Sequence, residues 1–190
     1  MNCGEIFLLE MTLNFIPKLT KFFLFLLAFS IPFATKAKVH ELKETKLTLY
    51  FRDTLVSPNA TVIPVGGIFG QIWSFTQFGT IYASDDVVTA SPEQNAPEVG
   101  RGQGLYMISE KNGQNAYMAL SIVFTNKEYN RSTIELQGVY EQFVPVTELS
   151  VVSGTRKFRF AKGFAQFGTY FVDTGFTFTV TWCNITMLHY

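Results

Sequence analysis

The feature that most constrains this chain is a period-two alternation of apolar and polar residues. The alternation is clearest at 47–52, 118–124 and 176–182. Successive side chains of a β-strand point to opposite faces, so this pattern predicts strands with one buried face. The last of these segments is rich in threonine and aromatic residues, which favour strands. No segment after residue 40 shows the 3.6-residue period of an amphipathic helix, so the sequence predicts an all-β protein.

Further strand-like segments fill much of the remaining chain. They are 76–82, 104–109, 132–139, 147–152 and 157–166. Short turn-forming sequences with Gly, Pro or Asn separate the strand-like segments. They lie at 66–67, 91–92, 111–113, 153–154 and 173–175. Many short strands with short connections are typical of a closed barrel or a β-sandwich, and the absence of repeats and linkers predicts a single domain.

The N-terminal segment has the order of a secretory signal peptide. Two lysines precede an apolar run at 22–33, and Ala34 and Ala37 then supply small residues at positions −3 and −1 of a cleavage site. The alternative is a membrane anchor, but the run is shorter than the ~20 residues that a spanning helix needs. The sequence therefore predicts a signal peptide at 1–37, a mature domain at 38–190 and no membrane anchor.

The composition excludes several classes of function. The chain has 15 basic and 15 acidic residues, and removal of the signal peptide leaves twelve basic and thirteen acidic ones. This balance argues against a nucleic-acid partner, which requires a basic surface. Two cysteines and two histidines are too few for a Cys/His zinc site, so no metal is expected. No redox-cofactor motif appears, and no serine or cysteine has a histidine partner in its sequence context, so no cofactor is expected.

Cys183 would be the only cysteine of the mature chain, because Cys3 leaves with the signal peptide. In an oxidising compartment it would be either a buried free thiol or part of an intermolecular disulfide. Its position inside an apolar, strand-like run favours burial.

Three Asn-X-Ser/Thr sequons are consistent with secretion. Those at Asn59 and Asn130 lie in polar, turn-like stretches, which predicts that both carry glycans. The sequon at Asn184 lies in the last strand pattern, where it is the weakest of the three candidates.

Asp53 is the most informative ionisable residue. It has the same parity as Leu49 and Phe51, so it lies on their inward face if the strand continues that far. Burial would then raise the pKa of its carboxyl and suit it to general acid catalysis. If the strand ends at Arg52, however, Asp53 opens a turn. Parity alone leaves both alternatives open.

Three other polar motifs favour structural interpretations. Asp85 and Asp86 are adjacent, so on a strand they point to opposite faces, and capping of a loop is the favoured interpretation over catalysis. The glycine-rich segment 100–104 resembles a phosphate-binding loop but continues as a strand, which favours a bend or a close approach within the sheet. The basic cluster at 156–162 alternates with phenylalanines, which indicates one solvated face and one core face.

Taken together, several segments resemble the plant dirigent proteins. The matching segments are 49–53, 78–86, 99–106, 151–155, 158–163 and 184–190. They appear in the order of the family and cover nearly all of residues 46–190. The resemblance implies an eight-stranded antiparallel β-barrel that is secreted to the plant apoplast and forms a homo-oligomer, a trimer or a dimer.

The resemblance implies a protein that guides stereochemistry and has no oxidative centre. On this basis we expect an auxiliary protein rather than an enzyme. A laccase or peroxidase would produce phenoxy radicals from monolignols such as coniferyl alcohol. The barrel would hold two of them so that coupling gives one stereoisomer, in lignan and phenylpropanoid biosynthesis. The alternative is a dehydratase, because relatives whose C-termini resemble 184–190 include pterocarpan synthases, which dehydrate an isoflavanol. A third possibility is a barrel that binds wall phenolics without turnover.

The resemblance also assigns candidate site residues. Asp53 closes the first-strand motif of the family, which favours a pocket carboxylate, and Tyr106 becomes a candidate substrate-binding hydroxyl. Two positions depart from the family pattern, since Tyr140 replaces a second acid and Thr147 replaces an arginine. The N-terminal cysteine that pairs with the equivalent of Cys183 in the family is also missing.

Overall fold

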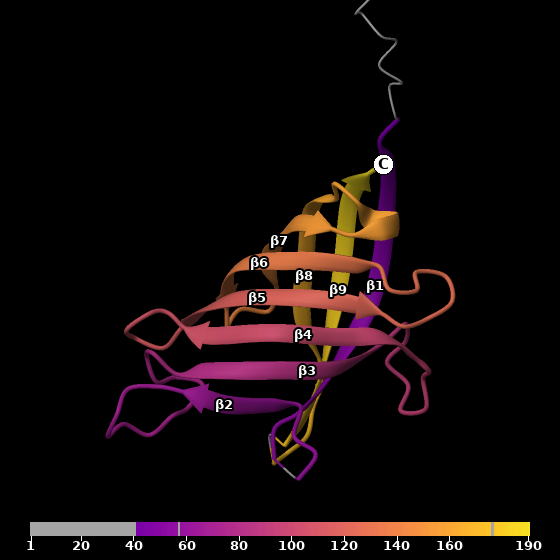
Figure 1. Ribbon diagram of the computed structural model, residues 1–190. Helices are drawn as coiled ribbons and strands as arrows, with labels where there is room; N and C mark the ends of the chain where they lie inside the picture. The colour runs from indigo at the N-terminus through magenta and orange to yellow at the C-terminus, as the bar shows by residue number, and fades with distance from the viewer. Residues whose placement is uncertain (1–40, 57, 176) are drawn as a thin grey trace, which may run out of the picture. The chain divides into compact units, whose positions relative to one another are not determined.

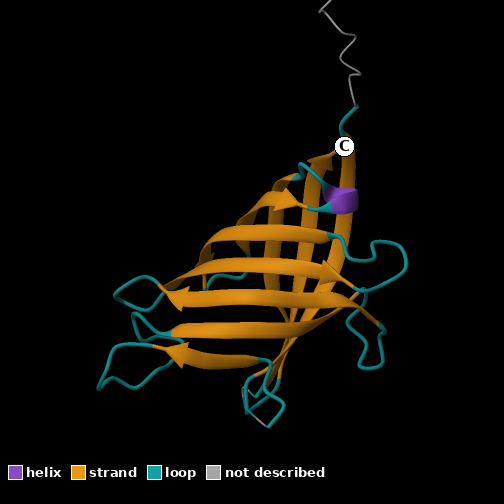
Figure 2. Ribbon diagram, viewed as in Figure 1, coloured by secondary structure: helices purple, strands orange, loops and turns teal. Residues whose placement is uncertain are grey.

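The computed structural model describes residues 41–56, 58–175 and 177–190, and the predicted signal peptide lies outside the described residues. The described part is all-β (Figures 1 and 2). Its strands are β1 (Lys43–Thr54), β2 (Val62–Gly66), β3 (Ile81–Thr89), β4 (Glu98–Ile108), β5 (Asn115–Phe124), β6 (Thr133–Glu141), β7 (Thr147–Gly154), β8 (Lys162–Val172) and β9 (Phe178–His189). One 3₁₀ turn, η1 (Arg156–Phe158), precedes β8. Within the described residues, no helix is long and apolar enough to cross a membrane.

The sheet closes on itself through β1 and β3. The strand order is β1-β9-β8-β7-β6-β5-β4-β3-β2, every pairing is antiparallel, and β1 also pairs with β3. Eight strands therefore form a closed barrel, and the eight-stranded, single-domain prediction is confirmed. β2 pairs with the first half of β3, at Ile81–Ser84, whereas β1 pairs with its second half, at Val87–Thr89. The two strands thus follow one another along the same edge of β3.

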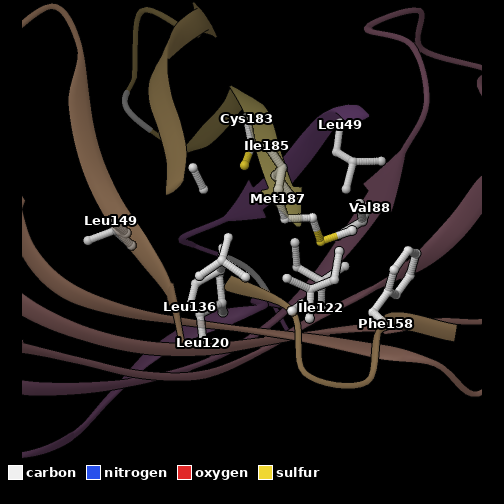
Figure 3. Packing of buried hydrophobic residues seen from close by; sticks show 14 of the residues in the cluster. Leu49, Val88, Leu120, Ile122, Leu136, Leu149, Phe158, Cys183, Ile185 and Met187 are labelled. Atoms are coloured by element: carbon white, nitrogen blue, oxygen red, sulfur yellow. The ribbon is translucent and has the colours of Figure 1, made fainter. Parts of the chain in front are cut away.

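The hydrophobic core fills the barrel with the inward members of each alternating strand. Figure 3 shows Cys183, Ile185 and Met187 of β9 in one cluster with residues from strands around the barrel, such as Leu49 and Leu136. Cys183 is a free thiol with no exposed surface, so the buried alternative is confirmed. Burial raises the pKa of this thiol well above its usual value, which disfavours oxidation.

The glycine-rich segment 100–104 belongs to β4, where it is a close-approach segment of the sheet. A Cβ atom at Gly104 would lie 2.1 Å from the carbonyl oxygen of Ala119 on β5, and one at Gly102 would lie 2.5 Å from the ring of Phe51. The close-approach alternative is therefore confirmed. Glycine at position 102 also leaves space for the Phe51 ring on the inner face.

Two predicted strands were wrong in their bounds, and one strand was missed. Segment 76–82 is mostly turn, with Gly79 at a φ of 84°, and β3 begins only at Ile81. Segment 157–166 begins with η1 and a residue of positive φ, Phe160, so β8 starts at Lys162. β2 escaped prediction because it contains a proline and three of its five positions are exposed, which leaves no alternation to detect.

Candidate functional site

β1 continues through Asp53 to Thr54, so the carboxyl of Asp53 follows Leu49 and Phe51 onto the inner face. The turn alternative is therefore wrong. Asp53 pairs with Thr179 on β9, whose hydroxyl donates a hydrogen bond of 2.8 Å to Oδ2 of the carboxyl. Burial raises the pKa of Asp53 to about 6, against the opposing effect of this hydrogen bond. The inner face therefore holds an acid whose proton is available near pH 6.

Asp86 lies on the inner face of β3, where only 5% of the residue is exposed. The hydroxyl of Thr61 donates a hydrogen bond of 2.6 Å to its Oδ1 atom. Burial, and next the charge of Asp53, raise the pKa of Asp86 to about 8. The capping interpretation of Asp86 is wrong, because the residue sits inside a strand rather than in a loop. Sequence reasoning could not place Asp86 beside Asp53, because their proximity depends on the pairing of β1 with β3.

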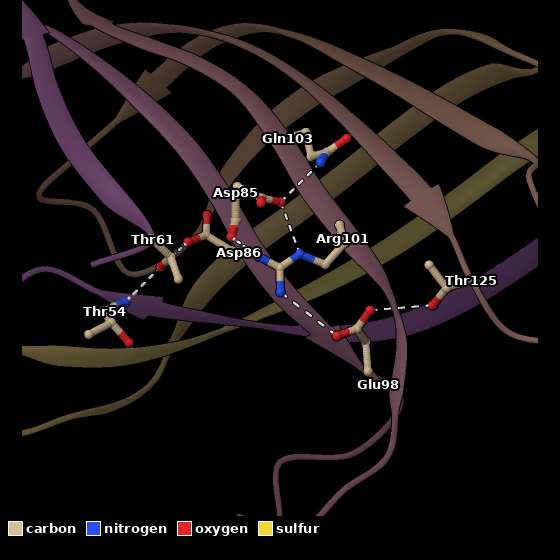
Figure 4. A network of polar contacts seen from close by, with 8 residues as sticks. All are labelled: Thr54, Thr61, Asp85, Asp86, Glu98, Arg101, Gln103 and Thr125. Atoms are coloured by element: carbon tan, nitrogen blue, oxygen red, sulfur yellow. Dashed lines mark hydrogen bonds and ion pairs between the residues drawn. The ribbon is translucent and has the colours of Figure 1, made fainter. Parts of the chain in front are cut away.

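Asp85 points the opposite way and belongs to a polar network on the outer face (Figure 4). Nε of Arg101 donates a hydrogen bond of 2.9 Å to Asp85, and Gln103 donates another of 3.0 Å. The hydrogen bond from Arg101 lowers the pKa of Asp85. Arg101 also lies 3.7 Å from Glu98. The prediction that Asp85 and Asp86 do not converge is confirmed.

Three tyrosines share the inner face with the buried carboxyls. Tyr106 of β4 contacts Tyr82 of β3 and Tyr140 of β6 edge to face, with ring centroids 6.1 and 6.0 Å apart. Burial raises the pKa of Tyr106 far above its usual value and that of Tyr140 to about 12, so both hydroxyls stay protonated. The charge of Asp53 contributes to both shifts, which places the two hydroxyls and the carboxyl in one electrostatic environment.

The side chain of Gln142 forms hydrogen bonds with the hydroxyl of Tyr106 and with two other loops of the barrel. Its side-chain oxygen accepts a hydrogen bond from Tyr106, and its Nε2 donates to the carbonyl oxygens of Phe75, at 2.9 Å, and Gly113, at 2.8 Å. These carbonyls belong to the β2–β3 and β4–β5 connections, and Gln142 itself follows β6. Sequence reasoning missed this residue, because nothing in a glutamine after a strand signals contacts to such distant loops.

Tyr140 and Thr147, the two departures from the family pattern, both have structural partners. Tyr140 contacts the ring of Phe167 at 6.1 Å, and Thr147 is buried and accepts a hydrogen bond of 3.0 Å from the backbone N–H of Glu141. Within the described residues, no ion pair reaches Asp53. The site therefore consists of carboxyls and tyrosine hydroxyls among aromatic rings.

A separate groove of about 550 Å³ lies on the outside of the barrel. It is lined by Arg52, Pro92, Gln94, Tyr170, Phe171, Phe178 and Val180. Arg52 neighbours Asp53 in sequence but points outward, and its guanidinium donates a hydrogen bond of 3.0 Å to the carbonyl oxygen of Pro92. The groove and the carboxyl site are therefore on opposite faces of β1.

No group of three or more metal-ligating side chains converges within the described part of the chain. The carboxyls of Asp53 and Asp86 each accept a hydrogen bond from a threonine hydroxyl, and both pKa values are raised. Carboxyls that retain their protons are poor metal ligands but suitable proton donors.

Comparisons with known proteins give consistent matches. A family profile described as Dirigent-like protein matches residues 44–188. The chain is 34% identical over 132 residues to Pterocarpan synthase 1 of Glycine max, which covers 68% of this chain and 70% of that protein. It is 35% identical over 147 residues to Dirigent protein 23 of Arabidopsis thaliana, with coverages of 77% and 79%. Among solved structures, the pterocarpan synthase dirigent protein GePTS1 superposes with a TM-score of 0.72 at 32% identity, over 80% of this chain and 88% of that one.

Proposed function

This chain belongs to the dirigent family, as its sequence motifs predicted, and we propose that it dehydrates a phenolic alcohol of the isoflavanol type inside the barrel. The observation that carries this proposal is Asp53, an inward carboxyl that retains its proton to about pH 6. An acid of this kind, near the tyrosine hydroxyls, suits protonation of a leaving hydroxyl group. The similarity to pterocarpan synthases of 34% and 32% identity supports the same activity.

In this reaction Asp53 donates one proton and later accepts one back. The protonated carboxyl of Asp53 donates its proton to the alcohol oxygen, the C–O bond breaks with its electron pair, and water leaves. A phenol oxygen of the same substrate then bonds to the electron-deficient carbon and loses its proton to the Asp53 carboxylate. Substrate minus one water gives the ring-closed product, and the acid is regenerated. A hydroxyl group of the substrate would donate a hydrogen bond to the hydroxyl oxygen of Tyr106, whose own proton is donated to Gln142, and this would orient the substrate.

A second function is favoured by the aromatic character of the same interior. Phe75 stacks on Tyr82 with ring centroids 4.3 Å apart, and Tyr106 and Tyr140 add further rings. Such rings could hold two planar phenoxy radicals in one relative orientation, so that proximity and face selection determine the stereoisomer. This function would need a laccase or peroxidase as the radical source, and monolignols as substrates.

Incubation of purified protein with an isoflavanol, without any oxidase, tests the proposal. Formation of the dehydrated, ring-closed product by chiral chromatography is the expected result. Coniferyl alcohol with a laccase, with and without the protein, tests the second function by enantiomeric excess. Absence of product in the first assay, together with enantiomeric excess in the second, would favour the second function over dehydration. If neither assay gives a positive result, only binding of phenolics remains.

Replacing Tyr106 with phenylalanine should lower kcat/KM for dehydration about fivefold. The change removes one hydrogen bond to substrate, which contributes about 1 kcal/mol, and it keeps the ring contacts with Tyr82 and Tyr140. Steady-state kinetics measure the effect. Gln142→Leu is the companion variant, because it leaves the hydroxyl in place but removes the group that orients it, and it should give a smaller loss. Unchanged kinetics in Tyr106→Phe would exclude Tyr106 from substrate binding.

We also propose that the protein is secreted to the apoplast, with a mature chain that starts near Lys38 and carries glycans. Asn59 and Asn130 are exposed and lie in turns, whereas Asn184 lies on β9 and accepts a hydrogen bond of 2.8 Å from Thr48. We expect glycans at Asn59 and Asn130. Intact mass before and after deglycosylation, measured on protein secreted by plant cells, checks both parts. A mass equal to the unmodified chain 1–190 would contradict them.

A further inference from the structure

Asp53 and Asp86 occupy facing positions where the pairing of β1 with β3 ends. The last three pairs are Tyr50 with Thr89, Phe51 with Val88 and Arg52 with Val87. One step further, the register brings Asp53 opposite Asp86. Both share the inward parity of Phe51 and Val88, which are buried. The two carboxyls therefore face each other on the inside of the seam.

Each carboxyl is held by a threonine from a neighbouring segment. The backbone N–H of Thr54 donates a hydrogen bond of 2.9 Å to the hydroxyl oxygen of Thr61, which directs the single hydroxyl proton of Thr61 to Asp86. Thr179 of β9 donates in the same way to Asp53. One oxygen of each carboxyl is therefore fixed, and the orientation of both groups is determined by the sheet.

Among the residues that the structure describes, no positive charge inside the barrel compensates this pair. Arg101 lies on the outer face, where it binds Asp85 and Glu98, and its charge lowers the pKa of Asp86 less than burial and Asp53 raise it. The groups that face the pair from β3, β4 and β6 are Tyr82, Tyr106 and Tyr140, which are neutral. Arg52 points outward to the carbonyl of Pro92. Two adjacent carboxylates without a counter-ion cannot both ionise readily in such surroundings.

We propose that Asp53 and Asp86 work as one acid: the pair holds a common proton, and Asp86 keeps it available to Asp53 at a pH at which a lone aspartic acid would have lost it. This inference rests on the proposed dehydration for its catalytic meaning, but the dyad itself does not depend on it. Asp86 acts through Asp53 and is a positioning residue. The pair loses its first proton near pH 6 and its second near pH 8, and both steps belong to the pair rather than to either residue.

The direct test is a titration of the aspartate carboxyl carbons by NMR, on full-length mature protein with ¹³C-labelled aspartate. In the wild type, both carboxyls should report two steps, near pH 6 and pH 8. In Asp86→Asn, which keeps an oxygen for the hydrogen bond from Thr61, Asp53 should titrate in one step near pH 6. Asp85→Asn is the matched control, because it removes the adjacent outward carboxyl and should leave both steps in place.

The pH dependence of kcat/KM for an isoflavanol provides the second readout. The basic limb should fall near pH 8 in the wild type and near pH 6 in Asp86→Asn, which gives equal rates at pH 5 and a loss of about tenfold at pH 7. A merely structural role would lower the rate equally at both pH values. Titration of both carboxyls near pH 4, or an unchanged profile in Asp86→Asn, would overturn the dyad. Two-step titration without dehydration would support the dyad and reject only the proposed function.

Discussion

Asp53→Asn is expected to lower kcat/KM for dehydration at least about 100-fold while the barrel stays folded. Asparagine has nearly the same volume as aspartate, and its amide oxygen can still accept the hydrogen bond from Thr179 that Asp53 accepts now. It has no proton to donate to a leaving hydroxyl group, however. If the protein guides radical coupling instead, the same variant should lose enantiomeric excess rather than turnover. Product formation with purified protein, and circular dichroism for the fold, give the two measurements.

Two companion variants separate the proton from the position of the carboxyl. Glu135→Gln makes the same acid-to-amide change on β6, where Glu135 accepts a hydrogen bond from Ser121 on the outer face, and should leave turnover unchanged. Thr179→Val removes the hydrogen bond that opposes the raised pKa of Asp53, so activity should persist to higher pH. Full activity in a folded Asp53→Asn protein would exclude Asp53 as the acid.

The barrel could be predicted from local pattern because its core is built from alternating strands. In β9 the apolar residues of the alternation at 176–182 lie on the outer face, where Phe178 and Val180 line the groove, and the core residues are Cys183, Ile185 and Met187. In β1 and β5, by contrast, the inward parity of Leu49 and Phe51 extended correctly to Asp53, and the alternation of 118–124 predicted the buried face. Such strands carry their orientation in their own sequence. Closure itself required the resemblance to a family, since a barrel and a sandwich share the same local pattern.

Asp86 shows what the local pattern could not provide. Its strand reads Ile81-Tyr-Ala-Ser-Asp-Asp-Val-Val-Thr89, in which polar and apolar residues do not alternate, so its inward face is not visible in the sequence. Its proximity to Asp53 depends on a pairing between strands 33 residues apart in the chain, and no single segment encodes that register. The same reason applies to Gln142, whose partners are the backbone carbonyls of Phe75 and Gly113. A site whose residues come from different strands can be predicted only when the register between those strands is known.

The folding stability of this protein is expected to fall by several kcal/mol as the pH rises from about 4 to about 8. In the unfolded chain both aspartates have pKa values near the ordinary 3.8, whereas in the barrel they are raised to about 6 for Asp53 and about 8 for Asp86. The folded state therefore binds more protons across this range. Its extra stability is fully present below the unfolded pKa and is lost as the pH rises through the folded values.

Urea unfolding at pH 5 and pH 8 measures this dependence and identifies its source. The wild type should be clearly less stable at pH 8, because the unfolded chain has then lost both protons, whereas the folded barrel must either take up protons or bury charge without a counter-ion. Asp86→Asn keeps the group neutral, so it should reduce the pH dependence and be more stable than the wild type at pH 8. Asp85→Asn, which removes an exposed ion pair with Arg101, should change stability by no more than about 1 kcal/mol and keep the wild-type dependence. Equal wild-type stability at pH 5 and pH 8 would mean that the two carboxyls ionise freely in the folded barrel, and it would remove the physical basis for acid catalysis at this site.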